Sequence, residues 1–112
     1  MTITEFLLAR IAEDEANIKG DWAAGDGGLH IIGSAMHGRM LAECAAKRAI
    51  VERYAENLDR AMAYRNPRWR DAMTDADRIE HRLQEARLAT SLEDCRSLAA
   101  AYASHPDYRE DW

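Results

Sequence analysis

The sequence predicts an all-α protein, an antiparallel bundle of three to four helices in one domain of residues 1–112. Three observations support this prediction. Residues 38–64 contain no proline and no internal glycine, and they are rich in residues that favour helices. Two further stretches repeat apolar residues every three or four positions, as amphipathic helices do. A chain of 112 residues is also long enough to bury one modest core.

The first helix is expected from Ile3 to Gly20. Thr2 and Glu5 have the spacing of a capping box at its start, and Gly20 is a typical helix terminator. Residues 21–34, DWAAGDGGLHIIGS, contain four of the six glycines and predict a short irregular or β-hairpin-like insertion. No Gly-Lys-Ser/Thr follows GDGG, so these glycines lack the pattern of a phosphate-binding loop.

Residues 38–64 are the expected central helix, about 40 Å long at 1.5 Å per residue. Cys44, Val51 and Leu58 lie seven residues apart on its apolar stripe. Its outer face carries oppositely charged pairs four residues apart, which predict a solvated side: Glu43–Lys47, Arg48–Glu52 and Glu56–Arg60. So long a helix in so short a chain requires the other helices to fold back along it. A homodimer through the long helix would cover the same stripe.

A third helix is expected from Thr74, because Asp77 follows it at the spacing of an N-cap. Before it, Pro67 in RNPRWR breaks the helical pattern. The inner face of this helix is predicted from its apolar spacing: Ala76, Ile79, Leu83 and Ala86.

The apolar spacing then shifts, which predicts a break near Thr90–Ser91. A fourth helix is expected from about Leu92 to Ala103. Pro106 ends it, and PDYREDW forms a short aromatic and acidic tail.

Composition and charge argue against several classes of protein. The net charge of −5 argues against a general nucleic-acid binder, which is normally basic. No apolar run approaches the roughly 18 residues that cross a bilayer, and no secretory signal is predicted at the N-terminus. Cys44 and Cys95 are too few for a disulfide framework and lie on apolar faces. They predict two buried, reduced thiols in a cytoplasmic protein.

One basic aromatic patch is the best candidate for partner binding: Arg65, Arg68, Trp69 and Arg70. Tryptophan and arginine are the residues most enriched at binding hot spots, so the patch predicts a protein partner. Contact with nucleic-acid phosphates is a second interpretation. A third is structural, with Trp69 closing one end of the bundle and the arginines paired with nearby carboxylates.

Two polar groups support another function, a small metal-dependent hydrolase. The first is an acidic cluster of Glu13, Asp14, Glu15 and Asp21. The second lies near the C-terminus and comprises His105, Asp107, Tyr108 and Asp111. Carboxylates along one helix are usually solvated, and Asp14 faces away from its neighbours. Tyr108 and Trp112 would instead fold back on the core. No HxxxH or HxxE sequence occurs, so neither a metal site nor another cofactor is predicted.

Three stretches carry a family resemblance: FLLARIAEDEA at 6–16, MLAECAAKRAIVERY at 40–54 and LAAAYASHPDYREDW at 98–112. They resemble a family of small actinobacterial and actinophage proteins known only as a domain of unknown function. The resemblance implies no activity and no site residues. It does imply a cytoplasmic accessory protein, encoded by a phage and modulating a host partner. A non-enzymatic protein-binding role is therefore the first expectation, ahead of hydrolase and nucleic-acid roles.

Overall fold

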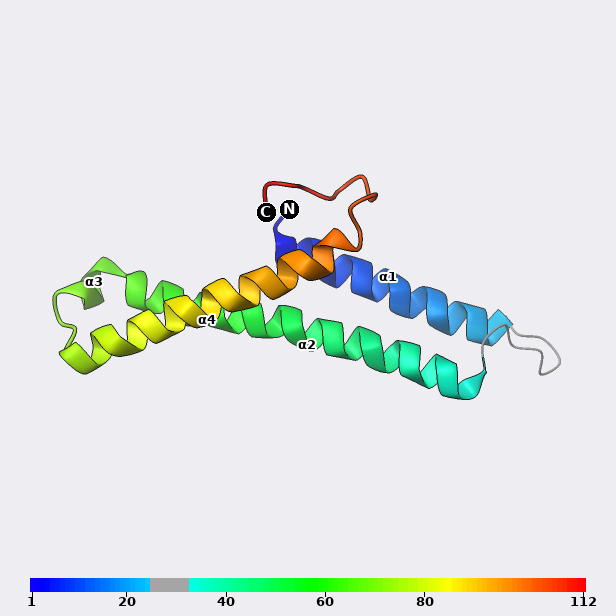
Figure 1. Cartoon of the computed structure of the whole chain (residues 1–112), viewed down its shortest axis with the longest axis horizontal. Helices are drawn as coiled ribbons and strands as arrows, with labels where there is room; N and C mark the ends of the chain where they lie inside the picture. Colours follow the sequence, from blue (N-terminus) through cyan, green and yellow to red (C-terminus); the bar gives the residue numbers. More distant parts are fainter. Residues whose placement is uncertain (25–32) are drawn as a thin grey trace.

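The computed structural model describes residues 1–24 and 33–112, and every regular element in these two ranges is a helix. The elements are α1 (Ile3–Ala24), α2 (Ser34–Arg65), the single turn α3 (Pro67–Arg70) and α4 (Asp75–Ala100). The predicted all-α class is therefore confirmed. The helices form a rod of 67 × 28 × 19 Å, much longer than it is wide (Figure 1).

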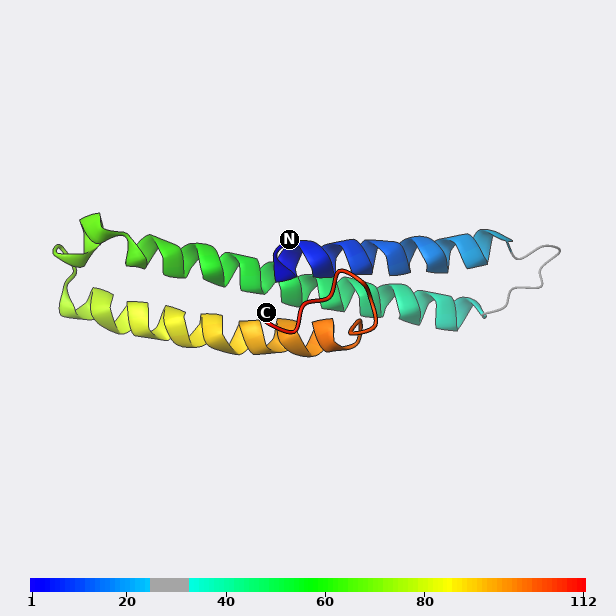
Figure 2. The same cartoon turned by 90° about the horizontal axis from the view of Figure 1, so that it is seen from above.

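The long helix α2 is the axis of this rod. α1 runs antiparallel to the N-terminal half of α2, and α4 runs antiparallel to the C-terminal half (Figures 1 and 2). The start of α1 and the end of α4 both contact the middle of α2, and the two chain termini lie close together there. Three helices therefore meet at the centre of the rod, while each end of the rod is a pair of helices.

The fully buried side chains gather at this centre. The largest of them come from all three long helices: Phe6, Leu7, Ile11, Val51 and Cys95. The residues after α4 cross back over the start of α1 (Figure 2). There the Phe6 ring contacts four rings of the tail: Tyr102, His105, Tyr108 and Trp112. The predicted packing of Tyr108 and Trp112 on the core is confirmed.

The helix that was expected to stop at Gly20 continues to Ala24. Gly20 has no left-handed φ, so it does not act as a terminating residue, and a glycine inside a helix costs only about 1 kcal/mol. The extra turn places the Trp22 ring 4.6 Å from the His37 ring of α2. The predicted insertion at 21–34 is thus helical over its first residues, and its remainder at 25–32 lies outside the described residues.

The start of α2 also differs from the prediction. The helix begins at Ser34 rather than at Gly38, which lies inside its first turns. The two capping boxes are confirmed. Thr2 and Glu5 exchange side-chain and backbone hydrogen bonds at the start of α1, and Thr74 and Asp77 do so at the start of α4.

The predicted break near Thr90–Ser91 is wrong, because α4 is continuous from Asp75 to Ala100. The Thr90 and Ser91 hydroxyls donate to carbonyl oxygens of the preceding turn instead of capping a new helix. The helix also ends at Ala100 rather than at Ala103, and the residues that follow form turns.

The apolar face predicted to point inward at the start of α4 points outward. All four of its residues are exposed: Ala76, Ile79, Leu83 and Ala86. The reason is that a continuous helix presents one face to α2, and Leu88, Cys95 and Ala99 fix that face in the core. Extended toward the N-terminus, the same face carries His81 and Gln84.

The contact between α2 and the first half of α4 is consequently polar. Asn57, Gln84 and Ser91 are all buried there. Asn57 Nδ2 donates to Ser91 Oγ at 3.3 Å. Gln84 donates to the Glu80 carboxylate, while its own carbonyl oxygen has no hydrogen-bond partner among the described residues. An unpaired buried acceptor is unfavourable, so the stability of the rod depends mainly on its apolar centre.

Replacing Phe6 with alanine tests this dependence. Phe6→Ala removes the ring through which α1 packs against the residues after α4, and we expect the free energy of unfolding to fall by roughly 3–5 kcal/mol. Urea unfolding followed by circular dichroism measures the change. Met62→Ala is the control, because Met62 is a large apolar residue of α2 that lies 55% exposed. Equal losses in the two variants would contradict a stabilising centre at Phe6.

Candidate partner-binding surface

The predicted patch lies at one end of the rod, which we call the α3 end and define as residues 61–65, α3 and residues 73–77. Asn66 makes the sharp turn between α2 and α3. Its backbone ends α2, and its side-chain oxygen accepts a hydrogen bond from the Arg68 N–H at 3.0 Å. Pro67 occupies the first position of α3, where the missing N–H has no helical partner to lose. The turn brings Trp69 back toward the end of α2.

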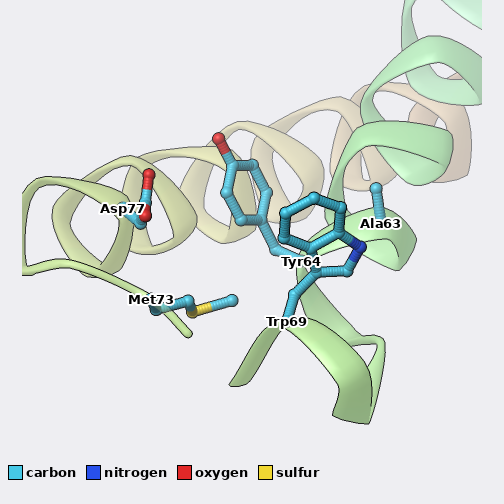
Figure 3. A pocket seen from close by; sticks show the side chains of 5 residues that line it. All are labelled: Ala63, Tyr64, Trp69, Met73 and Asp77. Atoms are coloured by element: carbon cyan, nitrogen blue, oxygen red, sulfur yellow. The ribbon is translucent and has the colours of Figure 1, made fainter. Parts of the chain in front are cut away.

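Trp69 borders an apolar hollow instead of closing the bundle. Its side chain is 62% exposed. The hollow measures about 320 Å³ and is lined by α2, α3 and the start of α4 (Figure 3): Ala63, Tyr64, Trp69, Met73 and Asp77. The Tyr64 and Trp69 rings lie next to each other, and Met73 lies across from them (Figure 3). Such a hollow has the shape and lining to accept one apolar side chain.

Two of the lining residues are held rigidly. The Tyr64 ring stacks on the His81 ring of α4, with centroids 5.6 Å apart and planes inclined by 14°. The Asp77 carboxylate accepts the Thr74 N–H of the capping box at 3.0 Å. One wall and the rim are therefore formed before any ligand arrives.

The three arginines of the patch differ in their partners. Arg65 forms a two-pronged ion pair with Glu85 of α4, and both of its hydrogen bonds measure 2.7 Å. Because Arg65 and then His81 donate to it, the pKa of Glu85 is lowered to about 2. Arg68 and Arg70 are exposed and form no ion pair within residues 1–24 and 33–112. Arg65 thus joins α2 to α4, and the other two arginines face solvent.

The acidic cluster of α1 does not converge on one point. Glu13 pairs with Arg10 at 3.0 Å, and Glu15 pairs with Arg48 of α2. Asp14 instead accepts the Tyr102 hydroxyl at 2.6 Å. Burial, followed by this hydrogen bond, raises the pKa of Tyr102. Glu15 and Asp14 therefore connect α1 to α2 and to the residues after α4, whereas Glu13 pairs within α1.

The polar group near the C-terminus is likewise engaged. His105 Nε2 contacts the Arg10 guanidinium, and its Nδ1 accepts the Asp107 N–H at 3.0 Å. The Asp111 carboxylate binds Arg109 through two hydrogen bonds of 2.9 and 2.6 Å. In the part of the chain that the structure describes, no three His, Cys, Asp or Glu side chains lie together as metal ligands would.

The cysteines are buried, free thiols at the centre of the rod, as predicted. Burial raises the pKa of Cys95 to about 11, and it also raises the pKa of Cys44. A thiol that stays protonated at neutral pH is a poor nucleophile, so neither residue has the setting of a catalytic cysteine.

Comparison with known families gives one match, a family of unknown function that covers residues 1–112. The chain belongs to the DUF6221 family. Comparison with curated proteins and with solved structures gives no match. The expected membership of a family of unknown function is therefore confirmed, and it assigns no activity to any residue of this DUF6221 protein.

Sequence reasoning identified Trp69 and its arginines in this DUF6221 protein but missed the rest of the hollow. Tyr64 lies near the end of α2 and Met73 in the connection between α3 and α4, so nothing in the sequence around either residue indicated a shared hollow. The proline after Tyr64 was the available signal, because a sharp turn there returns the chain to the end of α2.

Among the described residues, no helix is both long and apolar enough to cross a bilayer.

The Arg65–Glu85 pair predicts a pH-dependent contribution to stability. The folded-state pKa of Glu85 lies below its ordinary 4.5, so the pair stabilises the folded protein above that pH and loses its effect as the pH falls toward about 2. Both side chains are partly exposed, so Glu85→Gln should cost at most about 1 kcal/mol at neutral pH. Urea midpoints of parent and variant should converge between about pH 5 and pH 2.5.

Glu93→Gln is the matched control, because Glu93 pairs with Arg96 on one face of α4 and does not join two helices. Its cost at neutral pH should be smaller than that of Glu85→Gln. A difference between parent and Glu85→Gln that stays constant down to acid pH would contradict the lowered pKa.

Proposed function

We propose that this DUF6221 protein is a non-enzymatic protein-binding accessory protein that contacts its partner through the α3 end. The observation that carries the proposal is a tryptophan left 62% exposed beside a partly preformed apolar hollow. Large exposed apolar groups of this kind are typical of interaction sites. The proposed setting is the cytoplasm, with a host or other cellular protein as the partner and a phage as the source implied by the resemblance.

The hollow suggests the chemistry of the partner. Its two aromatic rings and Met73 favour an aliphatic or aromatic side chain, and about 320 Å³ accommodates one such group. Methionine adapts its shape to different occupants, so Met73 supports contact with more than one apolar residue type. Burial of Trp69 beneath a partner would supply much of the binding free energy, because tryptophan is the residue most enriched at hot spots.

The two solvent-facing arginines extend the same surface. Arg68 and Arg70 lie on either side of Trp69 in the sequence, within one turn of helix. Carboxylates beside the apolar anchor of a partner would pair with them, increasing the association rate and fixing orientation. The favoured partner is thus a protein segment with an apolar side chain flanked by Asp or Glu.

Nucleic acid is the weaker alternative for the same arginines. The chain carries a net charge of −5, and the exposed Asp71 and Asp75 follow α3 closely. These carboxylates would repel a phosphate backbone. The hydrolase alternative has less support, since the carboxylates of α1 are tied to three different neighbours.

The proposal is tested by identifying a bound protein and then measuring its affinity for purified variants. We expect Trp69→Ala to weaken binding by about 30-fold or more, the effect of losing a hot spot of 2 kcal/mol. Its melting temperature should stay close to that of the parent, because the side chain is mostly exposed. Isothermal titration calorimetry and thermal unfolding provide the two measurements.

Two further variants make the outcome specific. Met36→Ala removes an apolar side chain of similar exposure from the opposite end of α2 and should leave affinity unchanged. Arg68→Glu should weaken binding and lower its dependence on salt. Undiminished affinity in Trp69→Ala, or equal losses in Trp69→Ala and Met36→Ala, would exclude the α3 end as the binding surface.

A further inference from the structure

A second uncovered surface runs along the outside of α4. It is the outer stripe: Ala76, Ile79, Leu83 and Ala86. The spacing of three, four and three residues is that of a coiled-coil seam. Ile79 is 59% exposed and Leu83 46% exposed. At 100° per residue, the outer stripe lies about 140° around α4 from the face that contacts α2. α1 does not reach this half of the rod (Figure 1). Along one flank of the stripe, Leu83 and Ala86 line a hollow together with Arg53 and Arg60 of α2.

We propose that the outer stripe binds the outer stripe of a second copy of this chain, with the two α4 helices antiparallel. A symmetric pair is the commonest way for one surface to bury itself, since the same patch is used twice. Because the outer stripe lies about 140° around α4 from α2, the two α4 helices would lie in the middle of an almost flat row of four helices, with one α2 on each outer side. The proposal does not depend on the partner-binding hollow, because no residue that lines the hollow belongs to the outer stripe.

The charges beside the outer stripe select one register. Glu80 and Arg87 lie along the same flank of the stripe, and in an antiparallel pair related by a two-fold axis this flank meets its own copy. If Leu83 lies opposite Ala86 of the second copy, then Glu80 lies near Arg87 of the second copy. The two-fold axis repeats this contact, which gives two ion pairs between the copies.

The neighbouring register is disfavoured by the same charges. If Ile79 lay opposite Leu83 of the second copy, each Glu80 would approach the other Glu80. On the opposite flank, Arg82 would then approach Arg82 of the second copy. Like charges on both flanks argue against this alignment. The first register sets the large Leu83 against the small Ala86, which allows close packing of the two helices, and it places Ile79 opposite Thr90 of the second copy.

The homodimer expected through the long helix would use a different surface. The buried positions of α2 are Cys44, Val51, Asn57 and Ala61. α1 and α4 pack over these positions. A second copy that leaves the fold intact therefore meets an apolar seam on α4 rather than on α2.

Sedimentation velocity on the full chain, over a range of concentrations, tests the proposal. The parent is expected to form a dimer that dissociates on dilution. Leu83→Glu should be monomeric at every concentration with unchanged helicity, because its side chain is half exposed in the monomer. The matched control, Met62→Glu, places the same charge on a similarly exposed residue of α2 and should remain dimeric.

Charge reversal tests the register. Glu80→Arg and Arg87→Glu should each weaken the dimer by about tenfold, and the double variant should restore the parent dissociation constant. The melting temperature of each variant separates this effect from loss of the Glu80–Arg87 contact within one chain. A parent that stays monomeric at high concentration, or a Leu83→Glu variant that dimerises normally, would overturn the proposal. A double variant that stays weak would overturn the register.

Discussion

Phe6 occupies the point where α1, α2, α4 and the tail all come together. Its ring contacts four rings of residues 102–112, and the buried side chains of all three long helices surround it. Burial of so much apolar surface at one place is the main source of free energy in a chain of this size. It fixes the ends of α1 and α4 against the middle of α2, and the rest of the rod extends from that joint.

The rotation of α4 follows from this joint. Cys95 and Ala99 are buried at the centre, and a straight helix carries the same rotation along its whole length. Gln84 and His81 therefore face α2, and the apolar Ile79 and Leu83 face outward. The polar contact between α2 and α4 thus results from packing at the other end of α4. On hydrophobicity alone, the face of α4 that carries Ile79 and Leu83 would have been expected to contact α2.

The sequence was sufficient to predict those features of the fold that depend only on neighbouring residues. The helices themselves, the caps at Thr2 and Thr74 and the break in the helix before Pro67 depend on residues only a few positions apart, and the structure contains each of them. Periodicity located an apolar stripe on α4 but could not show which way it faces, because that depends on a contact near Cys95. The break predicted near Thr90 has the same cause. α4 carries one apolar stripe that faces outward and another that faces the core, and in the sequence this change of stripe looks like the end of one helix and the start of another.

The candidate site shows the same limit. Trp69, Arg68 and Arg70 are exposed, because a proline turn between helices is a surface feature. Arg65 is a different case, since its pair with Glu85 joins residues 20 positions apart in the sequence. The hollow itself is formed by three elements, and only their arrangement in space defines it.

Both uncovered surfaces lie in the half of the rod that α1 does not reach. α1 has 22 residues and α2 has 32, and α1 packs along the N-terminal half of α2. The other half is a two-helix hairpin with a polar seam, which has little apolar contact of its own. A partner on either surface would stabilise this half by binding only its folded form. Because α1 is short, the half of the rod that it leaves uncovered has little apolar packing of its own. The same half carries both surfaces that are proposed to bind a partner.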